Sequence, residues 1–437
     1  MPVNCNECDL KVRMASILLG CIADDFTGAT DLANNLVRAG MRVIQTIGVP
    51  TDVLAHDVDA VVVSLKSRTI EPDDAVKQSL EALRWLQRHA AKQIYFKYCS
   101  TFDSTREGNI GPVIDALMAE LETDFTVATP AFPDVGRTIY QGYLFVGDVL
   151  LNESGMQDHP LTPMTDANLL RVLQPQTKHR VGLVNYLHSG KSDEAIAERF
   201  HALRHQGVAI AVVDALRNDD LIRLARAVKE LPLVTAGSGL AIGLPANFGI
   251  EPNVQATELP KAEGKRAIIS GSCSRATQGQ VAHFIECGGK AIHVDVMALA
   301  QAPEQFELLK QQVMQACMED TVLVYSTAAP QQLAQIQAKL GTMAVGEQVE
   351  QWLAQIAQCL VTAGVGQLIV AGGETSGAVV QALGMDALRI GQQVDPGVPW
   401  CHGVARLGGQ THPLHVSLKS GNFGGQDFFT RAFEVLS

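Results

Sequence analysis

Short runs of β-branched and other apolar residues alternate along the chain with stretches in which apolar residues recur every three to four positions. The runs have the length of strands and the stretches have the period of a helix, so the pattern predicts alternating β-strands and α-helices. Such alternation is typical of a mostly parallel sheet covered by helices. In the first half the predicted strands are residues 16–23, 41–47, 59–65, 93–97, 125–128, 181–184, 208–213 and 233–235, and the predicted helices are 29–38, 73–89, 110–121 and 192–205.

One polar stretch rich in proline and glycine, residues 248–266, interrupts this alternation and is predicted to be a linker. We therefore predict an α/β fold of two α/β domains with mostly parallel sheets, and an active site in the cleft between them. Their predicted bounds are 14–250 and 265–437, after an N-terminal tail of residues 1–13. After the linker the predicted strands are 267–270, 291–294, 322–325 and 367–371, and the predicted helices are 304–318 and 345–363.

Residues 129–165 are rich in proline and glycine without a clear period. A segment of this length without regular elements is usually functional. We predict a long loop that passes over the active site.

Composition narrows the classes of partner. A formal net charge of -12 argues against nucleic acid, because binding to a phosphate backbone needs a basic surface. Nine scattered cysteines, an odd number, indicate reduced thiols and a cytoplasmic location. The apolar run 15–23 is far shorter than the roughly 20 residues of a membrane span, so we expect no membrane partner. A homo-oligomer is compatible with this composition.

Candidate metal and cofactor motifs are few. Cys5 and Cys8 form one CxxC without a second pair, and the histidines form no metal-binding array, so we predict no resident metal site. No P-loop sequence occurs. A glycine turn at 237–243 follows a strand, but its spacing is one residue too long for a dinucleotide-binding motif.

Two adjacent acids, Asp24 and Asp25, follow the first predicted strand, where a Thr27-Gly28 turn opens a helix. Neighbouring carboxylates repel each other, so the pair needs a cation, hydroxyl donors or helix amides nearby. Such a pair suits the binding of sugar hydroxyls or Mg²⁺, or the work of a base, and an aspartate N-cap is the structural alternative. We predict that Asp24 and Asp25 are catalytic and bind substrate, and that Thr27 also binds substrate.

Cations and hydroxyls follow two further strands of the first half. Arg68 lies after the strand 59–65, and Lys97 and Asp103 lie at and after the strand 93–97. Lysine and arginine are the natural partners of a carboxylate, and arginine can bind one through two bonds. We predict that Arg68 and Lys97 hold a substrate carboxylate and that Asp103 belongs to the same site; a solvated Ser/Thr-rich loop is the alternative.

Glycine- and serine-rich turns follow three strands of the second half, at 270–277, 371–378 and 420–425, and Lys419 precedes the last. Turns of this kind expose backbone amides at the positive end of a helix, which suits a phosphate group. Tight turns between strands and helices also need glycine for steric reasons. Three such turns in one domain favour a site for the phosphate groups of a nucleotide.

Taken together, these segments resemble the four-carbon acid sugar kinases. The resemblance covers about residues 14–437 and rests on long motifs in one order. They are IADDFTGATD at 22–31, VSLKSR at 63–68, YFKYCSTFDST at 95–105, GRTIYQGYLFV at 136–146, ISGSCS at 269–274, VAGGETSG at 370–377, PGVPW at 396–400 and LKSGNFG at 418–424.

The resemblance implies an N-terminal acid-sugar-binding domain and a C-terminal nucleotide-binding domain. It implies transfer of the ATP γ-phosphoryl group, with Mg²⁺, to the terminal 4-hydroxyl of 3-oxo-tetronate in the catabolism of four-carbon acid sugars. By motif position, the nucleotide would be bound by Ser272, Gly372, Gly373, Glu374, Thr375 and Gly421. Lys419 is the candidate for stabilising charge on the transferring group.

Other readings stay open at the level of sequence. D-threonate and D-erythronate 4-kinases are the close alternatives within the family. A nicotinamide-dependent sugar-acid dehydrogenase would use the glycine turn at 237–243. A non-catalytic sensor of sugar acids would bind its ligand in the same cleft without turnover.

Overall fold

The computed structural model describes residues 17–51, 58–159, 161–327 and 342–436. The predicted tail of residues 1–13, with Cys5 and Cys8, lies outside the described residues. Across the part that is described, no helix is long and apolar enough to cross a membrane.

The first half of the chain forms a parallel sheet in the order β2-β3-β1-β4-β11-β5-β10-β9. Every predicted strand of this half is present, and β1 lies between β3 and β4, where it is buried along its whole length. The strands are β1 (Leu19–Ala23), β2 (Val43–Ile47), β3 (Ala60–Ser64), β4 (Gln93–Lys97), β5 (Thr126–Thr129), β9 (Arg180–Val184), β10 (Val208–Val213) and β11 (Leu233–Ala236).

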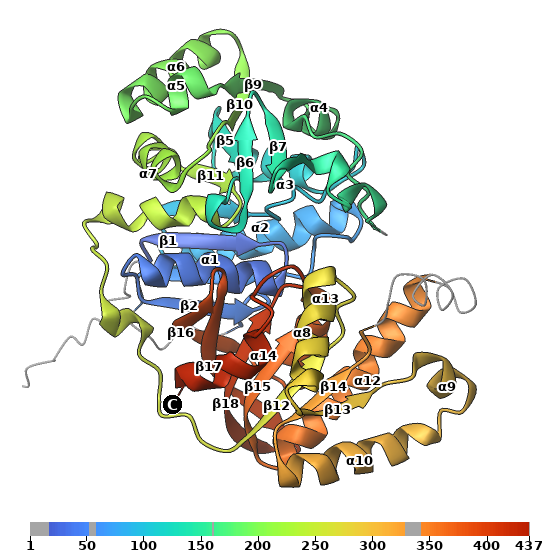
Figure 1. Ribbon diagram of the computed structural model, residues 1–437. Coiled ribbons are helices and arrows are strands. Elements are labelled where there is room, and N and C mark those ends of the chain that lie inside the picture. The colour runs from blue at the N-terminus through green and yellow to red at the C-terminus, as the bar shows by residue number, and fades with distance from the viewer. Residues whose placement is uncertain (1–16, 52–57, 160, 328–341, 437) are drawn as a thin grey trace, which may run out of the picture.

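Helices cover this sheet (Figure 1). Helix α1 begins at Phe26 because the Asp25 side chain accepts a hydrogen bond from the amide of Gly28 and so caps the helix. The apolar stripe of α1 packs on the sheet. The helices of this half are α1 (Phe26–Arg38), α2 (Pro72–Arg88), α3 (Ile110–Glu120), α4 (Leu169–Leu173), α5 (Tyr186–Ser189), α6 (Asp193–His205) and α7 (Asn218–Ala227), with short 3-10 turns η1 (Pro133–Val135), η2 (Leu151–Glu153), η3 (Met156–Asp158), η4 (Gln174–Gln176), η5 (Gly239–Gly243) and η6 (Pro245–Phe248).

Residues 129–165 are not the long loop that the sequence predicted. They hold an antiparallel sheet of three short strands, β6 (Arg137–Tyr140), β7 (Tyr143–Val146) and β8 (Val149–Leu150). Gly142 and Gly147 take the positive φ angles of 75° and 64° that let the chain reverse between these strands. The strands are too short for a sequence pattern of period two to stand out.

The second half contains the parallel strands β13-β14-β12-β15-β18, again with helices. Its described elements are β12 (Lys265–Ser270), α8 (Arg275–Glu286), β13 (Lys290–His293), α9 (Val296–Gln301), α10 (Gln305–Glu319), β14 (Val322–Tyr325), α12 (Thr342–Thr362), β15 (Val365–Ala371), α13 (Gly373–Ala382), β16 (Ala387–Asp395), β17 (Val398–Leu407), β18 (Gln410–Lys419), α14 (Phe428–Arg431) and η8 (Ala432–Leu436), preceded by η7 (Val254–Thr257) in the predicted linker.

The sequence did not predict β16 and β17, which join the two halves into one sheet of 15 strands. Both are antiparallel to their neighbours, and β16 pairs with β2 through the register Leu388 to Gln45. The sequence of β16, ALRIGQQVD, mixes buried, half-buried and exposed positions and contains glycine and two glutamines, so it does not have the pattern of a buried apolar strand. The expectation of separate sheets is therefore replaced by one continuous, mixed sheet.

Candidate active site

Three neighbouring strands of the N-terminal half deliver polar side chains to one edge of the sheet. Asp24 directly follows β1, and Arg68 and Lys97 come from the ends of β3 and β4 on either side. The Asp24 amide donates to the Lys97 carbonyl at 3.1 Å, and the Ser67 amide donates to the Asp24 carbonyl at 3.0 Å. Backbone pairing thus holds the acid pair between the two cations.

Arg68 binds both aspartates. Its Nε and Nη2 atoms donate to the two Asp24 oxygens at 2.8 and 2.9 Å, and Nη2 also donates to Asp25 Oδ1 at 2.6 Å. The cation that this acid pair requires is therefore Arg68. With both carboxylates bound to it, Arg68 is positioned to fix the aspartates, and its role in holding a substrate carboxylate stays a prediction.

The two aspartates differ in their electrostatic surroundings. Burial raises the pKa of Asp24 above its ordinary value, although Arg68 opposes that rise. Burial acts in the same direction on Asp25, but Arg68, Lys97, the Thr27 hydroxyl and the Gly28 amide together hold the pKa of Asp25 below its usual range. Adjacent acids with pKa values displaced in opposite directions are a feature of catalytic pairs.

The remaining predicted substrate residues lie close by. Thr27 Oγ1 donates to Asp25 Oδ2 at 2.7 Å. A Cβ atom on Gly28 would lie 2.6 Å from Lys97 Nζ, so that ammonium lies directly against the first turn of α1. Asp103 accepts a 2.6 Å hydrogen bond from Thr101 and lies 3.8 Å from Arg68 Nη1. Thr27, Lys97 and Asp103 therefore belong to one cluster with the acid pair.

The three glycine- and serine-rich turns of the C-terminal half also come together, because β12, β15 and β18 are adjacent parallel strands. A Cβ on Gly421 would lie 2.5 Å from Ser272 Oγ, and one on Gly372 would lie 3.2 Å from the Ser272 amide. Gly372 has a φ of 123°, which side chains rarely adopt. The turns form a cradle in which glycine backbone lies against small hydroxyl side chains, an arrangement that suits close approach to a phosphate.

Lys419 lies beneath this cradle and is fully buried. Its Nζ atom donates to Thr277 Oγ1 at 3.0 Å and to the carbonyls of Ser420, Gly421 and Phe423 at 3.0 to 3.2 Å. Burial lowers the pKa of Lys419 to about 7. The side chain is thus engaged with the 420–423 turn, and direct contact with a transferring phosphoryl group stays a prediction.

We expect Lys419→Met to weaken nucleotide binding by loosening that turn. Methionine has similar length but donates no hydrogen bond, so the Ser420 carbonyl loses the side-chain donor that Lys419 supplies, at a cost of about 1–3 kcal/mol if no other donor replaces it. The carbonyls of Gly421 and Phe423 keep donors from Ser274, Thr277 and Gln280 but lose the one that ties them to Ser420. Calorimetric titration with ADP measures the change in nucleotide affinity, and a thermal melt measures the change in stability. Unchanged ADP affinity in a folded variant would show that Lys419 does not organise the turn.

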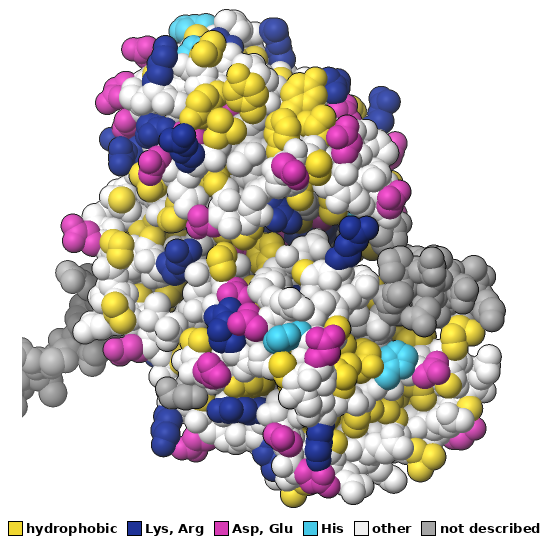
Figure 2. Space-filling model, in the orientation of Figure 1, with side chains coloured by type: hydrophobic (Ala, Val, Ile, Leu, Met, Phe, Trp, Pro, Cys, Tyr) yellow, Lys and Arg dark blue, Asp and Glu magenta, His cyan; other side chains and the backbone are white. Residues whose placement is uncertain are grey.

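The polar cluster of the N-terminal half, here called the sugar-side cluster, faces the phosphate cradle. The cluster consists of Asp24, Asp25, Thr27, Arg68, Lys97 and Asp103. A Cβ on Gly373, the first residue of α13, would lie 3.6 Å from Thr27 Oγ1 and 3.8 Å from Asp25 Oδ2, and one on Gly377 would lie 2.9 Å from the Phe26 ring. The amino ends of α1 and α13 therefore abut. In the space-filling view the surface is hollowed between the two halves, and Lys or Arg side chains border the hollow (Figure 2).

An ion-pair cluster bridges the two halves beside this contact. Lys66, after β3, lies 3.0 Å from Glu374 of α13 and 3.2 Å from Glu350 of α12. Burial lowers the pKa of Lys66, but the two carboxylates outweigh it and raise that pKa above its ordinary value. Glu374, predicted to bind nucleotide, is thus held at the mouth of the cradle by a residue of the sugar side.

Two family models match the chain in sequence order: a sugar-binding N-terminal domain over residues 19–244 and a nucleotide-binding C-terminal domain over residues 267–429. The 3-oxo-tetronate kinase of Cupriavidus necator is 53% identical over 96% of this chain and 97% of its own length. The chain belongs to the four-carbon acid sugar kinase family. The 3-oxo-tetronate kinase of Haemophilus influenzae is 47% identical over 95% of this chain and 99% of its own.

Solved structures agree with this family assignment. A Salmonella typhimurium protein is 43% identical, with a TM-score of 0.82 over 95% of this chain and 98% of its own. A Haemophilus influenzae protein is 45% identical, with a TM-score of 0.74 over 96% of this chain and 100% of its own. The resemblance, the α/β fold with two domains and the phosphotransferase class predicted from the sequence are confirmed for this kinase.

Asp31 is a residue of the kinase that sequence reasoning missed. It lies in α1, is 4% exposed, and accepts a hydrogen bond from Ser238, while its Oδ1 atom has no hydrogen-bond partner among the described residues. Burial raises the pKa of Asp31 to about 7. Its sequence signal was an acid on the buried face of a predicted helix, three residues beyond Gly28.

We expect Asp31→Asn to stabilise the kinase increasingly as pH rises from about 4 to about 7. The unfolded carboxyl ionises near pH 3.9 and the folded one near 7, so wild type loses stability through this window at up to about 1.4 kcal/mol per pH unit. Asparagine does not titrate and escapes that loss. Melting temperatures of both proteins at pH 5, 6, 7 and 8 measure it, and a pH-independent difference would contradict the prediction.

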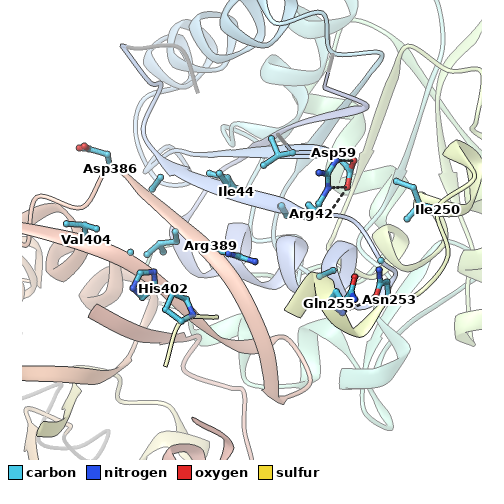
Figure 3. Close-up of a pocket in the computed structure, with 18 of the residues that line it drawn as sticks. Arg42, Ile44, Asp59, Ile250, Asn253, Gln255, Asp386, Arg389, His402 and Val404 are labelled. Carbon is cyan, nitrogen blue, oxygen red and sulfur yellow. Dashed lines mark hydrogen bonds and ion pairs between the residues drawn. The ribbon is translucent and has the colours of Figure 1, made fainter. Parts of the chain in front are cut away.

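A separate pocket of about 810 Å³ lies between β2, β16 and the linker (Figure 3). Its lining includes Arg42, which pairs with Asp59, and Arg389 and His402 from the other half. None of the predicted site residues lines it. We therefore place the candidate active site of the kinase at the α1–α13 contact, away from this pocket.

Proposed function

We propose that the protein transfers the γ-phosphoryl group of ATP to the terminal 4-hydroxyl of 3-oxo-tetronate, giving 3-oxo-tetronate 4-phosphate and ADP. The observation that carries the proposal is the contact between the two sites. The Asp25 carboxylate and the Thr27 hydroxyl lie against Gly373, where the phosphate cradle opens. An acceptor hydroxyl and a phosphoryl group bound at these places would be neighbours.

In this proposal Asp25 orients the acceptor. Its pKa is held low by Arg68 despite burial, so it stays ionised at neutral pH and can accept the hydrogen bond of the 4-hydroxyl. The hydroxyl oxygen attacks the γ-phosphorus, the bond to the β–γ bridging oxygen breaks, and ADP leaves. The hydroxyl proton passes to Asp25 and then to solvent. Positioning and charge neutralisation supply most of the catalysis in such transfers.

The residues present fit ATP with Mg²⁺. At the cradle of Ser272, Gly372 and Gly421 the turns pack so closely that an added Cβ atom would meet neighbouring atoms, as expected where backbone must approach a phosphate. Within the described residues no group of three or more His, Cys, Asp or Glu side chains could hold a metal ion, which suits an ion that takes most of its ligands from phosphates and water. When bound, Mg²⁺ neutralises phosphate charge, and Glu374 is the carboxylate that we expect to reach it.

The choice of acceptor is supported by the names of the relatives, which are 3-oxo-tetronate kinases at 45–53% identity over nearly the whole chain. D-threonate or D-erythronate would fit the same groups, because both carry a carboxylate, hydroxyls and a terminal 4-hydroxyl. The substrate panel must therefore include these acids.

ADP release by the purified protein with MgATP tests the proposal. The panel holds 3-oxo-tetronates generated in situ, D- and L-threonate, and D- and L-erythronate, each with an ATP-only control. We expect one 3-oxo acid to give the highest kcat/KM. Turnover of threonate or erythronate alone would support a kinase with a different acceptor. The absence of ADP release with every acid of the panel would contradict the proposal.

A further inference from the structure

Arg137 opens β6, within the three-stranded sheet that follows β5. The chain before it runs alongside the 237–239 turn. A Cβ on Gly237 would lie 3.0 Å from the Pro130 carbonyl oxygen, and one on Gly239 would lie 2.4 Å from that of Ala131. The same turn carries Ser238, which binds Asp31 of α1. The segment that leads into Arg137 is thus packed against the sugar-side cluster.

The charged groups around Arg137 include members of the sugar-side cluster. Burial lowers the pKa of Arg137, and the groups that act against this are Cys99, Asp103 and Asp31. Asp103 in turn lies 3.8 Å from Arg68. Asp31 also interacts electrostatically with Lys97. Arg137 thus shares two acidic neighbours with the cations of the cluster, Asp103 with Arg68 and Asp31 with Lys97.

Arg137 is nevertheless not neutralised by any one acid. Among the described residues, no Asp or Glu oxygen lies within 4.0 Å of its guanidinium, whose hydrogen bond goes to the Val135 carbonyl. Its Nε atom is buried and has no hydrogen-bond partner in the described part of the chain. A buried donor without an acceptor is costly, and a ligand that supplies the acceptor removes that cost.

Lys97 is in a similar position. Its Nζ donates to the Tyr98 carbonyl at 2.8 Å, and within the described ranges it forms no ion pair shorter than 4.0 Å. Arg68 is the opposite case, because its guanidinium binds both Asp24 and Asp25. Arg68 is thus fully paired with acids of the cluster, whereas Arg137 and Lys97 keep donors that a ligand could use.

We propose that Arg137, together with Lys97, binds the carboxylate of the acid sugar, while Arg68 positions the aspartates. A guanidinium presents parallel donors that match the two oxygens of a carboxylate. The carboxylate would then lie at the Arg137 end of the cluster and the 4-hydroxyl at the Asp25 end, next to Gly373. This assignment rests on the proposed function and makes Arg137 the residue that distinguishes an acid from a neutral sugar.

Steady-state kinetics with two acceptors test the assignment. The first is 3-oxo-tetronate, and the second is erythrulose, which has CH₂OH in place of the carboxylate. Loss of a charge-assisted hydrogen-bonded contact lowers kcat/KM by about 10- to 100-fold. We expect Arg137→Ala to lower kcat/KM for the acid by this factor, to leave that for erythrulose and the KM for ATP nearly unchanged, and to recover part of its activity on the acid in added guanidinium.

The control is Arg171→Ala, an arginine of the same half that is exposed and paired with Asp166. We expect it to keep the wild-type preference for the acid. Arg137→Lys, which keeps the charge, provides the measurement if the alanine variant does not fold. Wild-type turnover combined with an unchanged ratio of acid to erythrulose in the Arg137 variants would overturn the inference alone. A wild type that phosphorylates no acid would overturn the proposed function with it.

Discussion

Asp25→Asn is expected to lower kcat by about 10²- to 10⁴-fold, the range of a lost general base. Asparagine caps helices as well as aspartate does, so the hydrogen bond to the Gly28 amide and the start of α1 should survive. What is lost is the ionised acceptor beside Gly373. Stopped assays of ADP formation with saturating MgATP and 3-oxo-tetronate measure the change, and calorimetry with ADP shows whether the nucleotide is still bound.

Asp295→Asn is the matched control for Asp25→Asn. Asp295 caps α9 in the same way, through a 3.0 Å bond from the Ala298 amide. We expect this variant to keep wild-type kcat, so that a general effect of altered caps is separated from the chemistry of Asp25. A kcat for Asp25→Asn within threefold of wild type would remove Asp25 from the proposed mechanism.

Gly372→Ala is expected to raise the KM for ATP by about 10- to 100-fold with a smaller effect on the KM for the acid. The φ of 123° at Gly372 lies in a region that is essentially confined to glycine, and forcing a side chain into it costs about 1–3 kcal/mol. The added Cβ would also lie 3.2 Å from the Ser272 amide nitrogen, which donates to the Ala371 carbonyl in the same turn. The turn must therefore shift at the place where phosphate is expected.

Gly364→Ala is the control that separates the effect of backbone strain from an effect on the nucleotide site. Gly364 has a φ of 93° in the same half of the chain, and no heavy atom lies within 4 Å of the position that its Cβ would take. We expect a lower melting temperature for both variants but a higher KM for ATP only for Gly372→Ala. Equal KM values for ATP in the two variants would mean that the cradle does not hold the nucleotide.

Much of this architecture could be predicted from the sequence because buried parallel strands read as continuous apolar runs. The run before Asp24 is β1, and the acids fall at its carboxyl end as predicted. The hairpin of β16 and β17 could not be found this way. Its strands are partly exposed, and the pairing of β16 with β2 joins residues more than 340 positions apart, which no local pattern encodes.

The candidate site, like the fold, could be predicted from the sequence only in part. The adjacency of Asp24 and Asp25 was visible in the sequence, and so was the need for a cation beside them. The sequence did not show which cation binds the two acids, because Arg68 and Lys97 both follow apolar strands, the two that flank β1 in the sheet. Arg137 was hidden for another reason: it lies in a segment whose short strands gave no clear period. Only the packing of that segment on the 237–239 turn brings it to the cluster.

The continuous sheet has a consequence for catalysis in this family member. The sugar and nucleotide halves are joined by backbone hydrogen bonds between β2 and β16 as well as by the ion pairs of Lys66. If the two proposed sites are correct, the shared sheet holds them near each other before either ligand binds. Such preorganisation supplies part of the positioning that phosphoryl transfer requires.

The central claim is transfer of phosphate to the 4-hydroxyl of 3-oxo-tetronate, and proton-coupled ³¹P NMR of the reaction mixture tests it most directly. The account predicts a new phosphomonoester signal split into a triplet by the two protons of C4, appearing in step with ADP and absent with Asp25→Asn. A doublet, which would place the phosphate on a carbon with one proton, or ADP formation with inorganic phosphate as the sole new signal, would contradict it.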